Sequence, residues 1–347
     1  MDFRSYLIRR LLLVVPVLIG VSVLIFGLLQ LFPPYQRAML YITDPKQMTN
    51  IEEIIEQYGL NAPIWQQYVT WITEVFHGNL GWSKVVGMSV TDAIVNFLPA
   101  TLELALFATP IIIIGGIWLG TKAAAHKDKF IDHATRTGAI IGWSLPTFWF
   151  GLVLLMVFYG FFSGLLPPER LSTGTSIIVH SESFTRYTGL NFLDGVLNGE
   201  WRVFWDSLRH MVLPVITLSV INIAFIMRLM RSSMLESLGK GYILTARAKG
   251  LPERTVINKH ARRNAMIPVL TVSGYLFAAL VNGVVITESI FNYKGLGWWA
   301  WRTAVQLDVS SILGFALFSG VLFVLSNLVV DLLYARFDPR VRLGGSI

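Results

Sequence analysis

The chain of 347 residues is 54% hydrophobic and only 14% charged, whereas soluble domains carry about 25% charged residues. Too little polar surface remains to cover a water-soluble globule of this length, so we predict an integral membrane protein. The lack of cysteine excludes disulfides and cysteine-based metal or nucleophile chemistry. The net charge of +7 is distributed over the loops and does not form one nucleic-acid-binding patch.

Six apolar stretches are long enough to cross a bilayer, which requires about 20 residues each. The first is too long for a signal peptide and lacks a cleavage site, so we expect a retained span. No span has an acidic or basic residue near its middle, and Glu103 and Asp331 at span ends are expected to be interfacial. Pro146 is expected to kink the third span or mark its start. The predicted spans are residues 11–32, 104–121, a stretch within 137–167, 211–227, 265–287 and 309–330.

The basic residues predict the orientation of these spans. If the N-terminus is cytoplasmic, nineteen of the 28 Lys and Arg residues lie inside, and fourteen of the 21 acids lie outside. Cytoplasmic loops carry an excess of Lys and Arg. We therefore predict a multi-pass protein of the cell (inner or plasma) membrane with both termini in the cytoplasm.

Two long segments fall on the outside. Within residues 33–99, apolar positions recur at helical spacing and predict two amphipathic helices, with a break from Gly59 to Pro63. These helices could lie on the membrane surface, pack on the spans or receive a partner. Residues 167–209 are rich in Ser, Thr and Gly and are expected to be irregular. The apolar positions of the two helices are Ile51, Ile54, Ile55, Tyr58, then Trp65, Tyr68, Trp71, Ile72, Val75 and Phe76.

Small and polar residues inside the spans suggest where helices approach one another or line a pathway. Three glycine pairs, Gly116/Gly120, Gly138/Gly142 and Gly160/Gly164, permit close helix packing, although chance explains them equally well. Polar side chains facing lipid are costly, so the polar residues are expected to face protein or a water-filled cavity. Candidate pathway residues are Ser219 and Asn222 in the fourth span, and Thr271, Tyr275 and Asn282, with Ala278 on the same face, in the fifth.

The cytoplasmic loop of residues 228–264 is the most informative part of the chain. It carries nine basic residues and two acids, Glu236 and Glu253. A short helix within it is expected to end at Gly250, a favourable C-cap residue, followed by Pro252. Small side chains in this helix would let a second protein approach the backbone, while Arg247 and Lys249 offer charge to an acidic groove. The alternative is an ordinary positive-inside loop that holds lipid headgroups.

Several motifs resemble those of one family, the permeases of ABC importers, in the peptide-permease branch that also handles nickel. The loop from Thr245 to Leu251 resembles the conserved cytoplasmic loop of that family. Two positions depart from the general pattern: Leu244 stands where the pattern opens with Glu, and the closing Pro, at Pro268, comes later than in the short form of the pattern. The matching segments are Leu98-Pro99-Ala100-Thr101-Leu102-Glu103-Leu104-Ala105, Ser144-Leu145-Pro146-Thr147-Phe148-Trp149, Arg228 to Glu236, Glu288-Ser289-Ile290-Phe291 with Gly295-Leu296-Gly297, and Asp331-Leu332-Leu333-Tyr334 with Asp338-Pro339-Arg340.

The resemblance implies an all-α type I ABC-importer permease fold, with an N-terminal unit (1–98) and a five-helix core (99–347) that contains a coupling loop at 228–264. It implies a second homologous permease subunit, two ATPase subunits and an extracytoplasmic solute-binding protein as partners in the bilayer. The implied ATPase-coupling residues are Leu244, Thr245, Ala246, Arg247, Ala248, Lys249, Gly250 and Leu251.

The chain has no phosphate-binding loop of the G-x-x-x-x-G-K-[ST] type. We therefore expect a non-catalytic subunit without a cofactor or metal site of its own, with ATP and magnesium bound by partner ATPases and no nucleic acid involved. Peptides are the default cargo, and oligosaccharides or metal chelates are the alternatives. A secondary carrier would need a coupling-ion site, and an intramembrane enzyme would need converging nucleophiles or ligands in the spans, none of which the sequence indicates.

Overall fold

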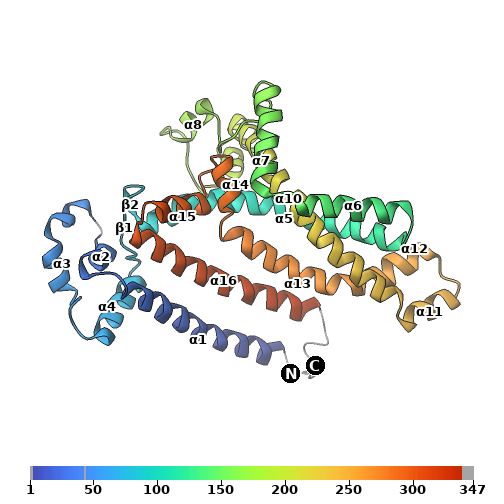
Figure 1. The fold of residues 1–347 in the computed structure, drawn as a ribbon, viewed down its shortest axis with the longest axis horizontal. Helices are drawn as coiled ribbons and strands as arrows, with labels where there is room; N and C mark the ends of the chain where they lie inside the picture. The colour runs from blue at the N-terminus through green and yellow to red at the C-terminus, as the bar shows by residue number, and fades with distance from the viewer. Residues whose placement is uncertain (1–2, 43, 338–347) are drawn as a thin grey trace.

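The computed structural model describes residues 3–42 and 44–337, and it is almost entirely helical (Figure 1). The α-helices are interrupted by two 3₁₀-helices, η1 (Met39–Tyr41) and η2 (Pro45–Asn50). They are also interrupted by two π-helical segments, η3 (Met156–Phe161) and η4 (Val256–Ala261). A two-stranded antiparallel hairpin joins β1 (Trp82–Ser83) to β2 (Met88–Ser89). The α-helices are α1 (Phe3–Leu29), α2 (Pro34–Ala38), α3 (Ile51–Gln57), α4 (Ile64–Phe76), α5 (Val90–Ala125), α6 (Phe130–Ser144), α7 (Thr147–Leu155), α8 (Thr173–Val179), α9 (Asn191–Leu197), α10 (Trp201–Leu238), α11 (Gly241–Ala248), α12 (Glu253–Thr255), α13 (Arg262–Val281), α14 (Val285–Ile290), α15 (Leu296–Val305) and α16 (Val309–Phe337).

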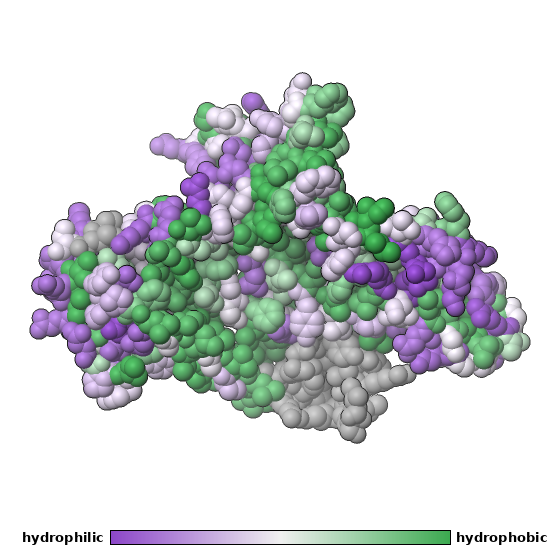
Figure 2. Space-filling view, viewed as in Figure 1, coloured by the Kyte–Doolittle hydropathy of each residue, from purple (hydrophilic) through white to green (hydrophobic). Residues whose placement is uncertain are grey.

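Among the described residues, five helices are long and apolar enough to cross a membrane, and each overlaps a different one of the six predicted spans. Hydrophilic residues gather at the two ends of this bundle, around α3 at one end and α11 at the other, with hydrophobic residues between them (Figure 2). That distribution suits a bundle whose middle lies in lipid. The five are Leu11–Leu29, Val90–Ala125, Trp201–Leu238, Glu253–Val281 and Val309–Val329.

The third predicted span is not one straight helix. Helices α6 and α7 with η3 are bent by 93° where Leu145 and Pro146 separate them. Pro146 lacks an N–H and disfavours a helical residue before it, so it starts α7 as an N-cap. The predicted effect of Pro146 is confirmed, and α7 stands apart from the other long helices in Figure 1.

The fifth predicted span, residues 265–287, is wrong at its outer end. Helix α13 stops at Val281, Gly283 adopts φ +104°, and the short α14 follows from Val285. A β-carbon at Gly283 would lie 2.7 Å from the backbone nitrogen of Gly297, so the chain turns where only glycine fits. The sequence did not indicate this turn, because apolar residues continue on both sides of it.

One of the three glycine pairs serves close helix packing. A β-carbon at Gly116 would lie 2.4 Å from the side chain of Ile226, and one at Gly120 would lie 2.6 Å from that of Met230, so α5 and α10 approach closely there. No atom lies within 4 Å of such a carbon at Gly138 or Gly160. A β-carbon at Gly142 would lie 3.6 Å from the Val220 side chain of α10, which is an ordinary contact distance. The prediction is therefore confirmed for the first pair, whereas Gly138 and Gly160 have no close neighbour among the described residues.

The outside segments surround the ends of these helices. The two predicted amphipathic helices are present as α3 and α4, beside the outer end of α1. Residues 167–209, expected to be irregular, instead contain α8, α9 and the start of α10. Asp194 organises this segment, since its carboxylate accepts hydrogen bonds from the Thr188 hydroxyl and the backbone N–H of Gly189.

Two predictions stay untested by this architecture. The proposed domain boundary after residue 98 falls inside α5, before Pro99. The tail motif at Asp338-Pro339-Arg340 lies outside the described residues, as does the C-terminus whose location was predicted.

Candidate functional site

The loop of residues 228–264 places α11 at the end of the bundle (Figure 1). Ile243 and Ala246, three residues apart on one face, are buried in the same cluster as Met234 of α10 and Val256 of η4. The spacing i, i+3 puts both anchors on one side of a helix. The other face of α11 is free for contact with another molecule.

That outward face combines apolar and small residues with charge. Leu244 is 64% exposed and Tyr242 41% exposed, a pattern that soluble surfaces rarely favour but that interfaces use. Thr245, Arg247, Ala248, Lys249 and Leu251 are exposed as well. Of the eight predicted coupling residues, only Ala246 faces the core.

Gly250 ends the helix as predicted. Its φ is +75°, its N–H donates to the Arg247 carbonyl at 2.9 Å, and the Leu251 N–H reaches back to the Ala246 carbonyl at 3.4 Å. These are the bonds of a glycine-terminated helix. A β-carbon at Gly250 would have no atom within 4 Å, so a substitution there is disfavoured by backbone conformation and not by collision within this chain.

The charges beside α11 are only partly free. Arg247 donates two hydrogen bonds to the Glu253 carboxylate, at 2.6 and 3.1 Å, and these bonds raise the pKa of its guanidinium. Both side chains are exposed, so the pair contributes little to stability. Lys240 pairs with Glu236 at 3.0 Å. Within the described part of the chain, Lys249 and Arg254 have no such ion pair.

A buried ion pair that the sequence did not predict joins α6 to α10, near the end of α10 that precedes α11. Arg231 of α10 donates two hydrogen bonds, at 2.6 and 2.7 Å, to Asp132 of α6, whose side chain is fully buried. The Arg228 guanidinium also lies over the Trp143 ring, 4.5 Å from its centroid. Bidentate pairing fixes orientation as well as distance, so α6 holds the end of α10 from which α11 departs.

A second polar cluster lies at the opposite end of the core. Glu103, expected to be interfacial, is fully buried, and its carboxylate accepts hydrogen bonds from Arg170 at 2.7 Å and the Tyr293 hydroxyl at 2.6 Å. The backbone N–H of Asn191 donates to the same carboxylate. Burial lowers the pKa of Arg170, but the charge of Glu103, the hydrogen bond to it and the contributions of Tyr293 together outweigh burial, so the net pKa is raised. Burial raises the pKa of Tyr293 well above its usual value.

A neighbouring buried carboxylate completes this outer cluster. Glu288 accepts from the Thr101 hydroxyl at 2.8 Å and from the Trp298 N–H at 2.8 Å, and Thr101 accepts from the Leu296 N–H at 2.8 Å. A β-carbon at Gly295 would lie 2.5 Å from the Thr101 hydroxyl oxygen, which explains a glycine there. Two of the motifs quoted for the resemblance, around Thr101 and around Glu288, therefore meet in space.

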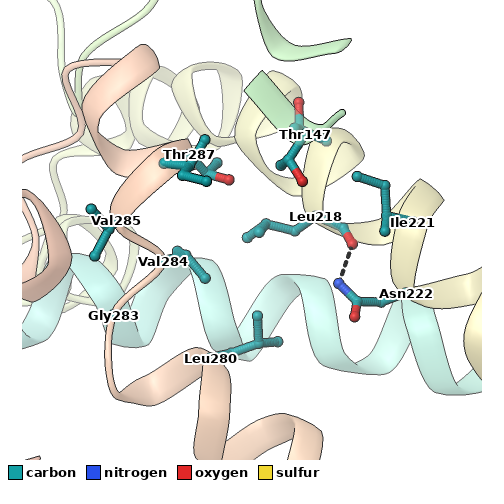
Figure 3. Close-up of a pocket in the computed structure, with 11 residues that line it drawn as sticks. Thr147, Leu218, Ile221, Asn222, Leu280, Gly283, Val284, Val285 and Thr287 are labelled. Atoms are coloured by element: carbon teal, nitrogen blue, oxygen red, sulfur yellow. Dashed lines mark hydrogen bonds between the residues drawn. The ribbon is translucent and has the colours of Figure 1, made fainter. Parts of the chain in front are cut away.

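Between the two ends lies a cavity of about 340 Å³. It is bounded by the start of α7, the middle of α10, and the turn from α13 into α14 (Figure 3). The lining is uncharged and mostly apolar, and its polar members include Thr147, Asn222 and Thr287. The Asn222 amide donates to the Leu218 carbonyl at 2.7 Å, which leaves its own carbonyl oxygen available. The other lining residues are Thr217, Leu218, Ile221, Leu280, Gly283, Val284, Val285 and Ile286.

Of the five predicted pathway residues, the structure places Asn222 on this cavity and the others elsewhere. Ser219 is buried, and its hydroxyl finds no partner among the described residues. Thr271 and Asn282 donate to carbonyls one turn back, of Ile267 and Ala278, and Tyr275 is 42% exposed. Their part in a pathway stays a prediction. Residues 283–287 were missed because the sequence suggested an unbroken span.

Comparison with known proteins gives matches over nearly the whole chain. Residues 112–343 match the family model described as "binding-protein-dependent transport system inner membrane component", and residues 3–105 match the N-terminal model of the same system. The chain is 38% identical to the probable D,D-dipeptide transport system permease protein of Escherichia coli strain K12, over 99% of each chain. It is 37% identical to the dipeptide transport system permease protein of the same strain, over 97% of this chain and 98% of that one. The oligopeptide transport system permease protein of Bacillus subtilis strain 168 is 35% identical, over 97% and 99%.

Proposed function

The chain belongs to the family of binding-protein-dependent transport system inner membrane components, and from that premise we propose that it forms one half of a pathway for peptides or similar solutes. It is a multi-pass membrane protein and a non-catalytic permease subunit of an ABC importer. The other half of the pathway would be a second, homologous permease subunit.

The observation that carries the proposal is the exposed face of α11. A short helix anchored to the core by Ile243 and Ala246 presents Leu244, Thr245 and the stretch up to Leu251 outward. We assign this face to a groove on one of two ATPase subunits, which bind ATP and magnesium. When ATP draws the ATPases together, α11 moves with them, and α10 and η4, which share its buried cluster, transmit the movement.

The cavity beside α7, α10 and α14 is the part of the chain best suited to line the pathway. Its mixture of apolar side chains with Thr147, Asn222 and Thr287 offers hydrogen bonds without a fixed charge. Such a surface suits a cargo that carries amides and variable side chains. An uncharged lining would also suit oligosaccharides or metal chelates. An experiment is therefore needed to distinguish these cargoes from peptides.

The orientation follows the charge distribution. Both termini and α11 are assigned to the cytoplasm, and α3, α4 and α8 to the side where a solute-binding protein delivers cargo. Because the chain has no cysteine, single cysteines report this directly. We expect an impermeant thiol reagent to label His180→Cys in intact cells and not Lys127→Cys; the reverse labelling would contradict the assignment.

The function is tested by reconstitution of the complete transporter in liposomes. We expect uptake of a labelled dipeptide that requires ATP and the peptide-loaded binding protein, with an excess of oligosaccharide or nickel chelate failing to compete. Uptake that persists without ATP and follows an imposed ion gradient would show a secondary carrier. Competition by the saccharide or the chelate would reassign the cargo.

A further inference from the structure

Helix α4, in the first outside segment, has three distinct faces. Gln67 and Trp71 are buried against the protein. A polar face carries Gln66 and Thr73, both exposed. Four further residues are apolar and exposed. On a helix of 3.6 residues per turn, three of them fall within an arc of about 40°, and the fourth, at the first position of the helix, lies about 100° away, beyond the half-buried Tyr68. The four are Ile64, Trp65, Val69 and Phe76, exposed by 63%, 65%, 55% and 85%.

A hydrogen bond sets the depth of α4 relative to the first span. The Tyr68 hydroxyl lies 2.8 Å from the hydroxyl of Ser22, and Ser22 lies within the apolar stretch Leu11–Leu29. At 1.5 Å per residue, Ser22 is about 10 Å along the helix from Leu29. Phe26, one turn above Ser22, packs against the rings of both Tyr68 and Trp71. Helix α4 thus packs on α1 at a level where α1 is still surrounded by acyl chains.

A polar network prevents α4 from turning its apolar face inward. Arg37, buried beside α1, donates hydrogen bonds to Gln30 at 2.6 Å, to Gln67 at 2.5 Å and to the Leu60 carbonyl at 3.2 Å. Gln67 in turn donates to the Ala62 carbonyl. Rotation of α4 would take the Gln67 acceptor away from the buried guanidinium, which is costly.

Helix α1, on which α4 packs, also exposes apolar side chains. On α1, Val23, Leu24 and Leu28 are also exposed and apolar. Helix α4 contains no Lys or Arg, and its one acid, Glu74, accepts a hydrogen bond from Asn79 at 2.8 Å. An apolar stripe bordered by polar residues, with a Trp on it, is the pattern of a helix that lies in a membrane interface.

We propose that α4 is an interfacial membrane helix, with Ile64, Trp65, Val69 and Phe76 inserted among the acyl chains of the leaflet at the outer end of α1. The occupant of this face is lipid. The inserted face then holds the outer end of α1 in the bilayer, and this role is independent of the transport proposal and of the identity of the cargo.

Site-directed spin labelling tests the proposal in the full chain. Val69→Cys and, separately, Trp65→Cys carry a nitroxide in phosphatidylethanolamine–phosphatidylglycerol vesicles, and collision with oxygen is compared with collision with a water-soluble nickel chelate. We expect oxygen to be favoured, as at the lipid-facing control Leu24→Cys. On the polar face of the same helix, Thr73→Cys is expected to favour the chelate.

Two results would overturn the proposal. A Val69 label that collides mainly with the chelate places the face in water. A Val69 label shielded from both reagents places it against protein, either a second permease or a binding protein. Because Trp65 and Val69 belong to one face, a variant that fails to fold leaves the other to decide, and the elution profile from size-exclusion chromatography identifies such a failure.

Discussion

The two ends of the core use charge in opposite ways. At the outer end, Glu103 and Glu288 are completely buried, and every acceptor oxygen described above is occupied by a hydroxyl, a guanidinium or a backbone N–H. At the cytoplasmic end, the charges beside α11 are exposed, and Arg247 pairs with Glu253 at the surface. Buried charges are costly to leave unpaired, whereas exposed pairs contribute little.

The difference assigns separate roles to the two ends. The outer cluster fixes the shape of the core, because it ties α5 to the turn between α14 and α15 and to the segment after α7. The α11 end is suited to recognition, because its exposed residues contribute little to folding. Substitutions in the buried ion pairs should therefore destabilise the protein, whereas substitutions on the exposed face of α11 should uncouple it.

The largest effect on stability is expected for Glu103→Leu. It leaves the buried Tyr293 hydroxyl without its acceptor and the half-buried Arg170 with only the Gly189 carbonyl. Breaking a buried pair in this way costs about 3–5 kcal/mol. We expect a large fall in thermal stability and in the amount of folded protein in detergent. The matched control is Glu169→Gln, since Glu169 is exposed and accepts one bond, from Asn292 at 3.1 Å. Equal stabilities for the two variants would show that the outer cluster does not hold the core.

A smaller loss is expected for Asp132→Asn. The substitution removes the charge from the bidentate pair with Arg231, and hydrogen bonds to charged groups contribute about 1.5–3 kcal/mol. The control Glu236→Gln, in the exposed pair with Lys240, should cost less than about 1 kcal/mol. Thermal unfolding in the same detergent measures both. If the control loses as much as Asp132→Asn, the buried pair is not what supports the end of α10.

For Arg247→Glu we expect almost no loss of stability but a clear loss of coupling. The exposed pair with Glu253 contributes under about 1 kcal/mol, whereas the charge reversal faces the proposed acidic groove. ATP hydrolysis stimulated by the peptide-loaded binding protein should fall. Lys127→Glu makes the same charge change in the other cytoplasmic loop and should be much milder. Similar losses in both variants would favour a general electrostatic anchor over a docking contact.

The sequence alone predicted the features that depend on local pattern. Apolar length located five spans, although three of the helices extend ten or more residues beyond the predicted bounds. Pro146 marked the bend before α7, and Gly250 marked the end of α11 with the expected positive φ. Each of these follows from a constraint that one short segment carries. The family resemblance added the fold class and the α11 assignment.

What the sequence did not predict depends on partners far apart in the chain. Glu103 was expected at an interface because it lies at the end of a predicted span; Tyr293, which donates to it, is 190 residues away. Asp132 and Arg231 are separated by 99 residues. The turn at Gly283 was hidden because apolar residues continue on both sides of it. Its signal was a glycine that the backbone of Gly297 approaches closely.

The central claim is that α11 transmits the action of the ATPases, and Gly250→Val tests it most directly in the complete transporter. A β-branched residue at φ +75° costs about 1–2 kcal/mol, but the empty space around Gly250 lets the chain remain folded and inserted. The measurement is the stimulation of ATP hydrolysis by the peptide-loaded binding protein, at matched amounts of assembled protein. The account predicts that this stimulation is lost in Gly250→Val, with Gly250→Asn, which tolerates positive φ, less affected. Normal stimulation and normal peptide uptake in Gly250→Val would contradict a coupling role for α11. The loop would then be interpreted as an ordinary positive-inside anchor.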